Sequence, residues 1–244
     1  MIPRLRAALR RYTRSVEDGR RAEVERFAES LLQSGEAFSN LLLVLLRDPE
    51  ASPESRVQAC WLLRALEERR AIPVLIKIVQ DRELEAVLRR EATQALGILR
   101  SKRAVRPLIE ILLDPDEDEW VRRLAAHTLG WLNDPRGRDV LFRVIKDPHV
   151  PPEIRGDAIE ALTGFIDVRA VPTLLEQLRD PSPEIRFWAV FSLGQLADTD
   201  VIPELERIAN HDDAVVPGLW SLRREARDAI QIIRDRAHQT CTGG

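Results

Sequence analysis

The stretch of sequence that decides the fold covers residues 114–130 and reads DPDEDEWVRRLAAHTLG. It opens with Asp-Pro, and because proline disfavours the α-helical conformation of the residue before it, a turn is expected there. Three, seven and ten residues beyond the first arginine of the stretch stand Ala125, Leu129 and Leu132. These offsets follow one face of an α-helix, so the stretch predicts a turn followed by an amphipathic helix.

This pattern recurs along the chain with a period of 33 residues. An alanine three residues after each repeated arginine and a leucine seven residues after it keep the same frame. A fixed period of this length is typical of stacked supersecondary units. The aspartate column, with every step equal to 33, consists of Asp48, Asp81, Asp114, Asp147, Asp180 and Asp213. The arginine column, whose last step is 31, consists of Arg56, Arg89, Arg122, Arg155 and Arg186.

A second, shorter amphipathic segment precedes each arginine. Several of these segments carry a proline near their start, where a missing N–H costs a helix little. Each unit therefore reads as a short helix, a turn that begins at the aspartate, and a longer helix that contains the arginine. The short segments are residues 72–79, 105–113, 140–145, 171–178 and 202–208.

The repeated pattern resembles that of HEAT-repeat proteins, specifically the short bacterial HEAT-like or bilin-lyase-type repeats. The resemblance rests on the Asp-Pro turn and on the motif V/I-R-x-x-A-x-x-A-L-G, seen from Val121 to Gly130 and from Ile185 to Gly194. It implies an all-α fold, a right-handed α-solenoid of about six helical hairpins. The same repeat serves enzymes, chaperones and adaptors, so the resemblance specifies the fold and leaves the activity open.

The frame divides the chain into three parts. Residues 1–37 form no clear repeat and are expected to be an N-terminal helical cap, and residues 237–244 are expected to be a flexible tail. Residues 38–236 are expected to form the solenoid. Its first and last units depart from the repeated pattern, as expected of units that cap the ends of a solenoid. Its units are residues 38–70, 71–103, 104–136, 137–169, 170–200 and 201–236.

Composition excludes several classes of protein. The chain has 244 residues, of which 44% are hydrophobic, and its 37 basic and 40 acidic residues give a net charge of −3. Because nucleic-acid-binding proteins neutralise phosphates with Lys and Arg, this balance argues against them. With 11 Gly and 5% aromatic residues the chain does not suit an all-β fold. The longest apolar run, residues 41–46, is too short to span a bilayer, so no membrane association is expected.

The sequence carries no motif of a catalytic or cofactor site. It has no Gly-rich phosphate loop, no GxSxG elbow and no His or Cys at metal-ligand spacing, so neither a metal nor a cofactor is expected. The acidic run 114–119 resembles the start of a calcium loop but lacks the required glycine and final glutamate. Cys60 and Cys241 lie far apart, which disfavours a disulfide and favours a reducing compartment, taken here as the cytoplasm.

The aspartate and arginine columns are expected to be structural. Each aspartate stands eight residues before its arginine in four units and six before it in the Asp180/Arg186 unit, so the two side chains can meet across the turn. A ladder of such pairs, within a unit or between neighbours, would fix the angle between repeats. A row of ligand-binding arginines is the alternative.

The candidate binding surface is the face of the longer helices two, five and nine residues after each arginine, which the resemblance places on the concave side. These positions vary while the core positions do not, and large apolar groups there need a cover. Aromatic residues are strong interface anchors, although packing between repeats is an equally weighted alternative. His127 also suits an acid or base beside Glu91 or Glu160, but a structural histidine is the preferred interpretation. The candidate partner-binding residues are Trp61, Glu91, Gln94, His127, Trp131, Glu160, Trp188 and Phe191.

The sequence favours a non-catalytic scaffold or adaptor that holds a protein or peptide partner on this face. Aromatic anchors ringed by carboxylates would complement a segment with apolar and Lys/Arg side chains. One alternative is a subunit similar to the bilin lyases, with Trp61, His127 and Trp131 along a flat tetrapyrrole. Another is a nucleic-acid-binding or repair solenoid, which the acidic face disfavours. The identity of the partner and the oligomeric state stay open.

Overall fold

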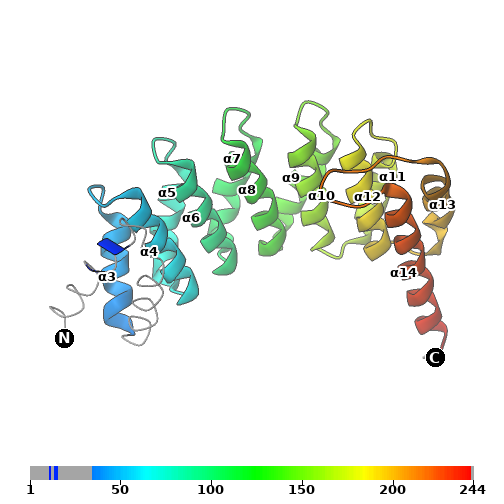
Figure 1. The fold of residues 1–244 in the computed structure, drawn as a ribbon. Helices are drawn as coiled ribbons and strands as arrows, with labels where there is room; N and C mark the ends of the chain where they lie inside the picture. Colours follow the sequence, from blue (N-terminus) through cyan, green and yellow to red (C-terminus); the bar gives the residue numbers. More distant parts are fainter. Residues whose placement is uncertain (1–10, 12–13, 16–34, 243–244) are drawn as a thin grey trace. The chain divides into compact units, whose positions relative to one another are not determined.

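The computed structural model describes residues 11, 14, 15 and 35–242, and this part of the chain is built from α-helices. The chain separates into two compact units, residues 1–111 and 112–244. In each unit the helices follow one another as antiparallel hairpins that stand side by side (Figure 1). The helices are α3 (Glu36–Arg47), α4 (Pro53–Ala65), α5 (Ile72–Gln80), α6 (Ala86–Ile98), α7 (Val105–Leu113), α8 (Glu119–Leu132), α9 (Pro135–Lys146), α10 (Pro152–Thr163), α11 (Val171–Gln177), α12 (Pro183–Leu196), α13 (Ile202–His211) and α14 (Leu222–Thr242).

The predicted all-α fold of about six hairpins is confirmed. The first helix of each pair, from α3 to α13, precedes the turn, and the second, from α4 to α14, follows it. In the described residues the only β-type pairing is an isolated antiparallel bridge between Val215 and Ser221, in the loop before α14. The predicted N-terminal cap, residues 1–37, lies outside the described residues except for positions 11, 14, 15 and 35–37. The segment predicted as a tail, 237–244, is helical as far as Thr242.

The aspartate column shapes the turns between paired helices. Asp48, Asp81 and Asp147 are the residues at which α3, α5 and α9 end. A carboxylate oxygen of each accepts a hydrogen bond from the backbone N–H two residues further on, at 3.0, 3.1 and 2.9 Å. Asp114 and Asp180 make the same bond. Because aspartate satisfies a turn N–H in this way, the column is explained by the local chemistry of the turn.

The arginines of the column bind backbone groups that stand earlier in the sequence. The guanidinium groups of Arg89, Arg122 and Arg155 donate to the carbonyl oxygens of the residues ten positions earlier, near the end of the preceding helix, at 3.3, 3.2 and 2.9 Å. These carbonyls have no partner within their own helix, so a buried cation that binds them closes the hairpin.

The predicted ladder between the two columns is therefore only partly what the structure shows. Arg155 does pair with Asp180 of the next hairpin at 2.5 Å. Arg186 pairs instead with Asp212 at 2.7 Å, one residue before the column position, and Asp213 pairs with Arg223. The column arginines therefore act both inside their own hairpin, through backbone carbonyls, and between hairpins, through the Arg155–Asp180 pair.

A third column with the same period lies where one hairpin ends and the next begins. Glu67, Arg100, Asn133 and Ile166 all have a left-handed backbone, with φ between 47° and 49°. In three of these connections a short 3₁₀ helix follows and leads into the next α-helix: η1 (Arg69–Ala71), η2 (Lys102–Ala104) and η3 (Val168–Ala170). A left-handed residue is a common way to end an α-helix, and it redirects the chain here.

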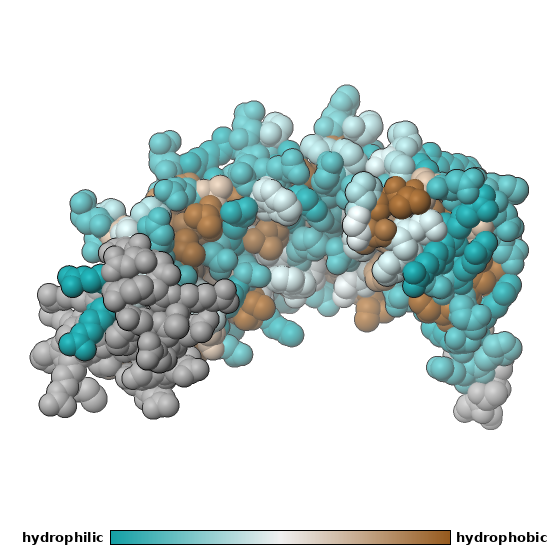
Figure 2. Space-filling view, viewed as in Figure 1, coloured by the Kyte–Doolittle hydropathy of each residue, from teal (hydrophilic) through white to brown (hydrophobic). Residues whose placement is uncertain are grey.

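The core consists of the repeated small and branched residues. The alanines three after each column arginine are fully buried, and the leucines seven after are at most 1% exposed. Where hairpins meet, small residues allow close approach: a Cβ on Gly130 would lie 2.9 Å from the backbone oxygen of Ala161. On the face in Figure 2, apolar residues form separate patches within a largely hydrophilic surface. None of the described helices combines the length and apolar character needed to cross a membrane.

Candidate functional site

A cavity of about 600 Å³ lies on the second unit, between three of the longer helices. His127 and Trp131 project from α8, Glu160 from α10 and Phe191 from α12, and Ile166 closes one end from the connection after α10. A volume of this size is typical of ligand and peptide-anchor sites. We call this site the α8/α10/α12 cavity. It brings together four of the eight residues predicted to bind a partner.

The repeat geometry explains why these side chains converge. His127, Glu160 and Phe191 each stand five residues after their column arginine, and Trp131 stands nine after. Successive longer helices pack against one another, so equal positions in the repeat share one face. Gly130 and Gly164 also line the cavity.

His127 is held by a network of charged groups at the cavity wall. Its Nε2 lies 3.2 Å from a carboxylate oxygen of Asp157, and its Nδ1 lies 3.9 Å from one of Glu160. The Nε of Arg123 donates to Asp157 at 2.5 Å. Asp157 itself is 4% exposed, so this buried carboxylate is shared between two cationic partners.

This network shifts the protonation of both partners. Burial alone would lower the pKa of His127, but the hydrogen bond to Asp157 and the charges of Asp157 and Glu160 outweigh burial and raise it. Burial likewise opposes ionisation of Asp157, yet His127 and Arg123 outweigh it, so the pKa of Asp157 is lowered. The pair therefore favours the charged imidazolium and the ionised carboxylate.

His127, Asp157 and Glu160 also form the kind of group that can hold a metal ion, with ligand atoms within 4.8 Å of one another. However, both Asp157 oxygens already accept hydrogen bonds from Arg123, at 2.5 and 3.3 Å. A divalent ion would have to displace this guanidinium, and the raised pKa of His127 disfavours the neutral imidazole that metals require. The arrangement suits an ion-pair network better than a metal centre.

The predicted tryptophans divide into two groups. Trp61 and Trp131 are exposed, at 42% and 49%. Trp188 is half-buried and stacks edge-to-face on Phe187 and Phe191, each at 5.7 Å between ring centres. A Cβ on Gly156 would lie 2.9 Å from its indole ring, so Trp188 packs against the preceding hairpin and supports Phe191.

In the first unit, Glu91 and Gln94 lie on α6 and face Arg64 of α4. Arg64 is 3.6 Å from the Glu91 carboxylate and donates a hydrogen bond to Gln94. Together with the Arg123–Asp157 pair, this corrects the expectation of an acidic face. Two of its carboxylates are paired with arginine, and Glu160, whose side chain is 42% exposed and lies 3.9 Å from His127, is the more accessible carboxylate of the cavity.

Sequence reasoning missed the role of Arg123. It stands next to the column arginine and is not at a position assigned to the binding face. Its ring contact with Trp120, 4.6 Å from guanidinium carbon to ring centre, and its bond to Asp157 bridge two helices. An arginine and a histidine one helical turn apart on the same helix were the available signal, but their shared carboxylate appears only in three dimensions.

Comparison with protein families identifies the repeats. The family model for HEAT repeats matches residues 39–119, 87–163 and 149–230, which together span most of the chain. The chain belongs to the HEAT-repeat family. The predicted resemblance is thereby confirmed, and the observed hairpins are HEAT repeats of an α-solenoid. The comparison with curated proteins gives no match.

Solved structures similar to this HEAT-repeat chain include natural and engineered proteins. A chain of the complex of CpcE and CpcF of phycocyanin lyase from Nostoc sp. PCC7120 is 25% identical, with a TM-score of 0.54 over 77% of this chain and 74% of that one. YibA of Escherichia coli is 18% identical, with a TM-score of 0.58 over 94% and 82%. An engineered protein is 17% identical, with a TM-score of 0.53 over 81% and 96%. The last two show the fold alone.

Proposed function

We propose that this HEAT-repeat protein is a non-catalytic scaffold or adaptor that binds a protein or peptide partner in the α8/α10/α12 cavity. The observation that carries the proposal is the convergence of Trp131, Phe191 and His127 on one cavity of about 600 Å³. Aromatic side chains next to a pocket are the residues that most often dominate the free energy of protein binding. The buried, unlinked thiol of Cys60 is compatible with a cytoplasmic setting.

The chemistry of the cavity restricts the partner. The rings of Trp131 and Phe191 and the side chain of Ile166 offer an apolar floor. Glu160 offers one partly exposed carboxylate at the rim, while Asp157 is already neutralised. The matching segment presents one large apolar side chain with a single Lys or Arg close by, rather than a strongly basic tract.

The test uses a double variant, Trp131→Ala with Phe191→Ala, and a control, Ile232→Ala. Ile232 is 40% exposed on α14 and does not line the cavity. Partners captured from the native host by the unaltered chain are identified, purified and titrated against each variant. We expect the double variant to weaken binding by roughly 30-fold or more, the loss typical of central aromatic anchors, and the control to bind normally. Equal binding by the double variant and the control would refute the proposal.

A second candidate is a subunit that handles a tetrapyrrole, as the bilin-lyase resemblance implies. It is favoured by the 25% identity to a chain of the phycocyanin lyase complex. In this case the same cavity would take the flat chromophore between Trp131 and His127. Addition of a phycobilin should then shift its visible absorbance, and Trp131→Ala should abolish the shift. An unchanged spectrum with intact partner binding favours the adaptor.

A further inference from the structure

The second large cavity, of about 740 Å³, lies in the first unit, where two connections between hairpins approach each other. Its lining contains five cationic side chains that no part of the proposed function uses: Arg69, Arg70, Arg100, Lys102 and Arg103. Arg69 belongs to η1, and Lys102 and Arg103 belong to η2, so equivalent turns of successive repeats supply them. We call this site the η1/η2 cavity.

The equivalent turns elsewhere in the chain neutralise their own arginines. At the position before the 3₁₀ helix or the following α-helix stands Glu68, Asp134 or Asp167, and each pairs with the arginine two residues later, at 2.7, 2.9 and 2.6 Å. The hydrogen bond from Arg70 lowers the pKa of Glu68 to about 2, so that carboxylate is fully ionised. Each of these three turns thus neutralises the arginine two residues after its carboxylate, while Arg69 of η1 is left outside such a pair.

The turn at η2 breaks this pattern. Ser101 stands where the other turns have a carboxylate, and Arg103 stands where they have the paired arginine. Within the described part of the chain, Arg103 forms no ion pair, and neither do Arg69, Arg100 or Lys102. The turn that faces the cavity therefore carries uncompensated positive charge, which favours an anion from outside the chain.

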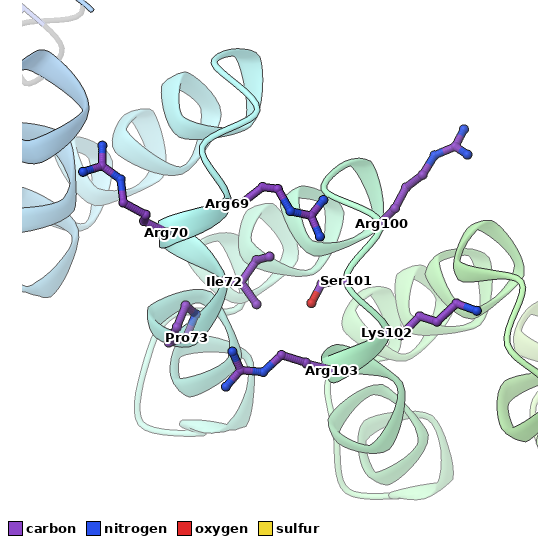
Figure 3. Close-up of a pocket in the computed structure, with 8 residues that line it drawn as sticks. All are labelled: Arg69, Arg70, Ile72, Pro73, Arg100, Ser101, Lys102 and Arg103. Carbon is purple, nitrogen blue, oxygen red and sulfur yellow. The ribbon is translucent and has the colours of Figure 1, made fainter. Parts of the chain in front are cut away.

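Two of the cationic side chains border the space of the cavity itself. Figure 3 shows Arg69 and Arg103 bordering opposite sides of the space in which Ile72 and the Ser101 hydroxyl lie, while Arg70, Arg100 and Lys102 point away from it. Arg69 is held in place by a 2.8 Å hydrogen bond to the carbonyl oxygen of Leu99, and its other N–H groups remain available.

The Ser101 side chain supplies a second, independent indication of a ligand. The residue is 3% exposed, and its hydroxyl accepts or donates no hydrogen bond with any residue that the structure describes. Because Ser101 lines the cavity and its oxygen is not among the fully enclosed unpaired atoms, the hydroxyl is open to the cavity and can bind what enters it. It adds a neutral donor between two guanidinium groups.

From these observations we propose that the η1/η2 cavity binds a phosphate monoester group, held between the Arg69 and Arg103 guanidinium groups and the Ser101 hydroxyl. A phosphate monoester carries a charge near −2 at neutral pH and has three terminal acceptor oxygens, which match two cations and one hydroxyl. Guanidinium groups bind such oxygens in pairs of parallel hydrogen bonds. A ligand with a single carboxylate carries only one negative charge and would leave one of the two guanidinium groups unmatched. Arg100 and Lys102 add a field that attracts the anion.

The proposal is tested by NMR titration of the full chain with inorganic phosphate and with a phosphoserine peptide, at constant ionic strength. Backbone amide shifts at Ser101 and Lys102 report the site. The decisive variant is Ser101→Asp, which installs the carboxylate that the turns at Asp134 and Asp167 already carry and should neutralise Arg103 without disturbing the fold. Arg169→Gln, in a neutralised turn, is the matched control.

We expect saturable, millimolar or tighter binding of both probes by the unaltered chain and by Arg169→Gln, with amide shifts centred on residue 101. Ser101→Asp and Arg103→Gln should weaken it by about tenfold or more. The unphosphorylated peptide should give no shifts. Absence of saturation, or equal binding by Ser101→Asp, would overturn the proposal. Single-stranded DNA that binds more tightly than the phosphoserine peptide, with a steep salt dependence, would replace it with nucleic-acid recognition.

Discussion

At the scale of single residues, Asp157 controls the chemistry of the α8/α10/α12 cavity. It is the buried carboxylate that both His127 and Arg123 contact, at 3.2 and 2.5 Å. A group in this position fixes the charge and the orientation of the histidine that faces the partner. Cys60 shows the opposite case: burial, with a smaller contribution from Glu91, raises the pKa of its thiol to about 12, so it acts as a small apolar residue.

Replacing Asp157 with Asn should lower the pKa of His127. Without the carboxylate, burial opposes the imidazolium, and Glu160 at 3.9 Å compensates only in part. Histidine NMR titration should place the His127 pKa above the ordinary value of about 6.5 in the unaltered chain and below its unaltered value in the variant. Glu160→Gln serves as the control and should lower it less. A His127 pKa that is the same in all three proteins would contradict the network.

The same pair sets a pH window for stability. Because the pKa of His127 is raised, its contribution is complete below the ordinary histidine value and is lost as the pH rises through the raised pKa. Because the pKa of Asp157 is lowered, its contribution is present above the ordinary aspartate value and is lost as the pH falls through the lowered pKa. The difference in unfolding free energy between the unaltered chain and Asp157→Asn should therefore be largest between these limits.

At the scale of helices, the distance between neighbouring hairpins depends on residues without side chains. Gly130 on α8 faces the backbone of Ala161 on α10, and Gly194 on α12 faces Ala229 on α14. In both cases an added Cβ would approach within 2.9 to 3.0 Å of atoms that belong to the partner helix. Small residues at these contacts let the longer helices pack closely enough to align the cavity walls.

Gly130→Ala should destabilise the chain although alanine is the better helix former. The new methyl group meets the Ala161 backbone, which cannot move like a side chain, and overpacking of this kind costs about 1–3 kcal/mol. The gain in helix propensity offsets about 1 kcal/mol of this. Denaturant unfolding should show a net loss of stability, whereas Gly164→Ala, at an exposed helix end, should stay within about 0.5 kcal/mol. A variant at Gly130 as stable as the unaltered chain would mean that the helices are not in close contact.

At the scale of the whole molecule, stability is built from repeated local closures rather than from one continuous ladder. Arg122 and Arg155 each hold the end of the preceding helix of their own hairpin. In repeat proteins each unit contacts only its neighbours, so such closures act nearly independently. The chain can then vary single units, as it does at Ser101, without loss of the fold.

Arg122→Ala should lower the free energy of unfolding by about 1–3 kcal/mol, because a charge-assisted bond is lost and the Leu112 carbonyl is left unpaired. Arg155→Ala should cost more, since it also releases Asp180. In the double variant the two losses should add to within about 0.5 kcal/mol. Strong non-additivity, measured by denaturant titration, would restore the ladder that the sequence first suggested.

The resemblance and the period together predicted the hairpins, and the reason lies in local physics. Asp-Pro turns and helical spacing of alanine and leucine act over ten residues or fewer, so a single chain displays them. The helix ends at Asp48, Asp81 and Asp147 follow directly from that chemistry. The left-handed positions at Glu67, Arg100, Asn133 and Ile166 escaped notice because their side chains have nothing in common.

The sequence predicted which helix face carries the candidate site, but not which side chains on it contact one another. Equal positions in the repeat pointed to His127, Trp131, Glu160 and Phe191, and the packing of α8, α10 and α12 places them around one cavity. Spacing does not show that Trp188 packs against Gly156. Nor does it show that Arg64 and Arg123 neutralise Glu91 and Asp157. Side chains on neighbouring helices are about 30 residues apart in sequence, and spacing does not specify which of them meet.

The sequence by itself determined the period, the turns and the buried stripe, because these depend on backbone preferences and on burial along single helices. Only the tertiary structure decided the pairing of charges: Arg122 with a carbonyl, Asp157 with His127, and Arg103 with no carboxylate at all among the described residues. Electrostatic energies change steeply over a few ångströms, and those distances are set when one hairpin packs on the next.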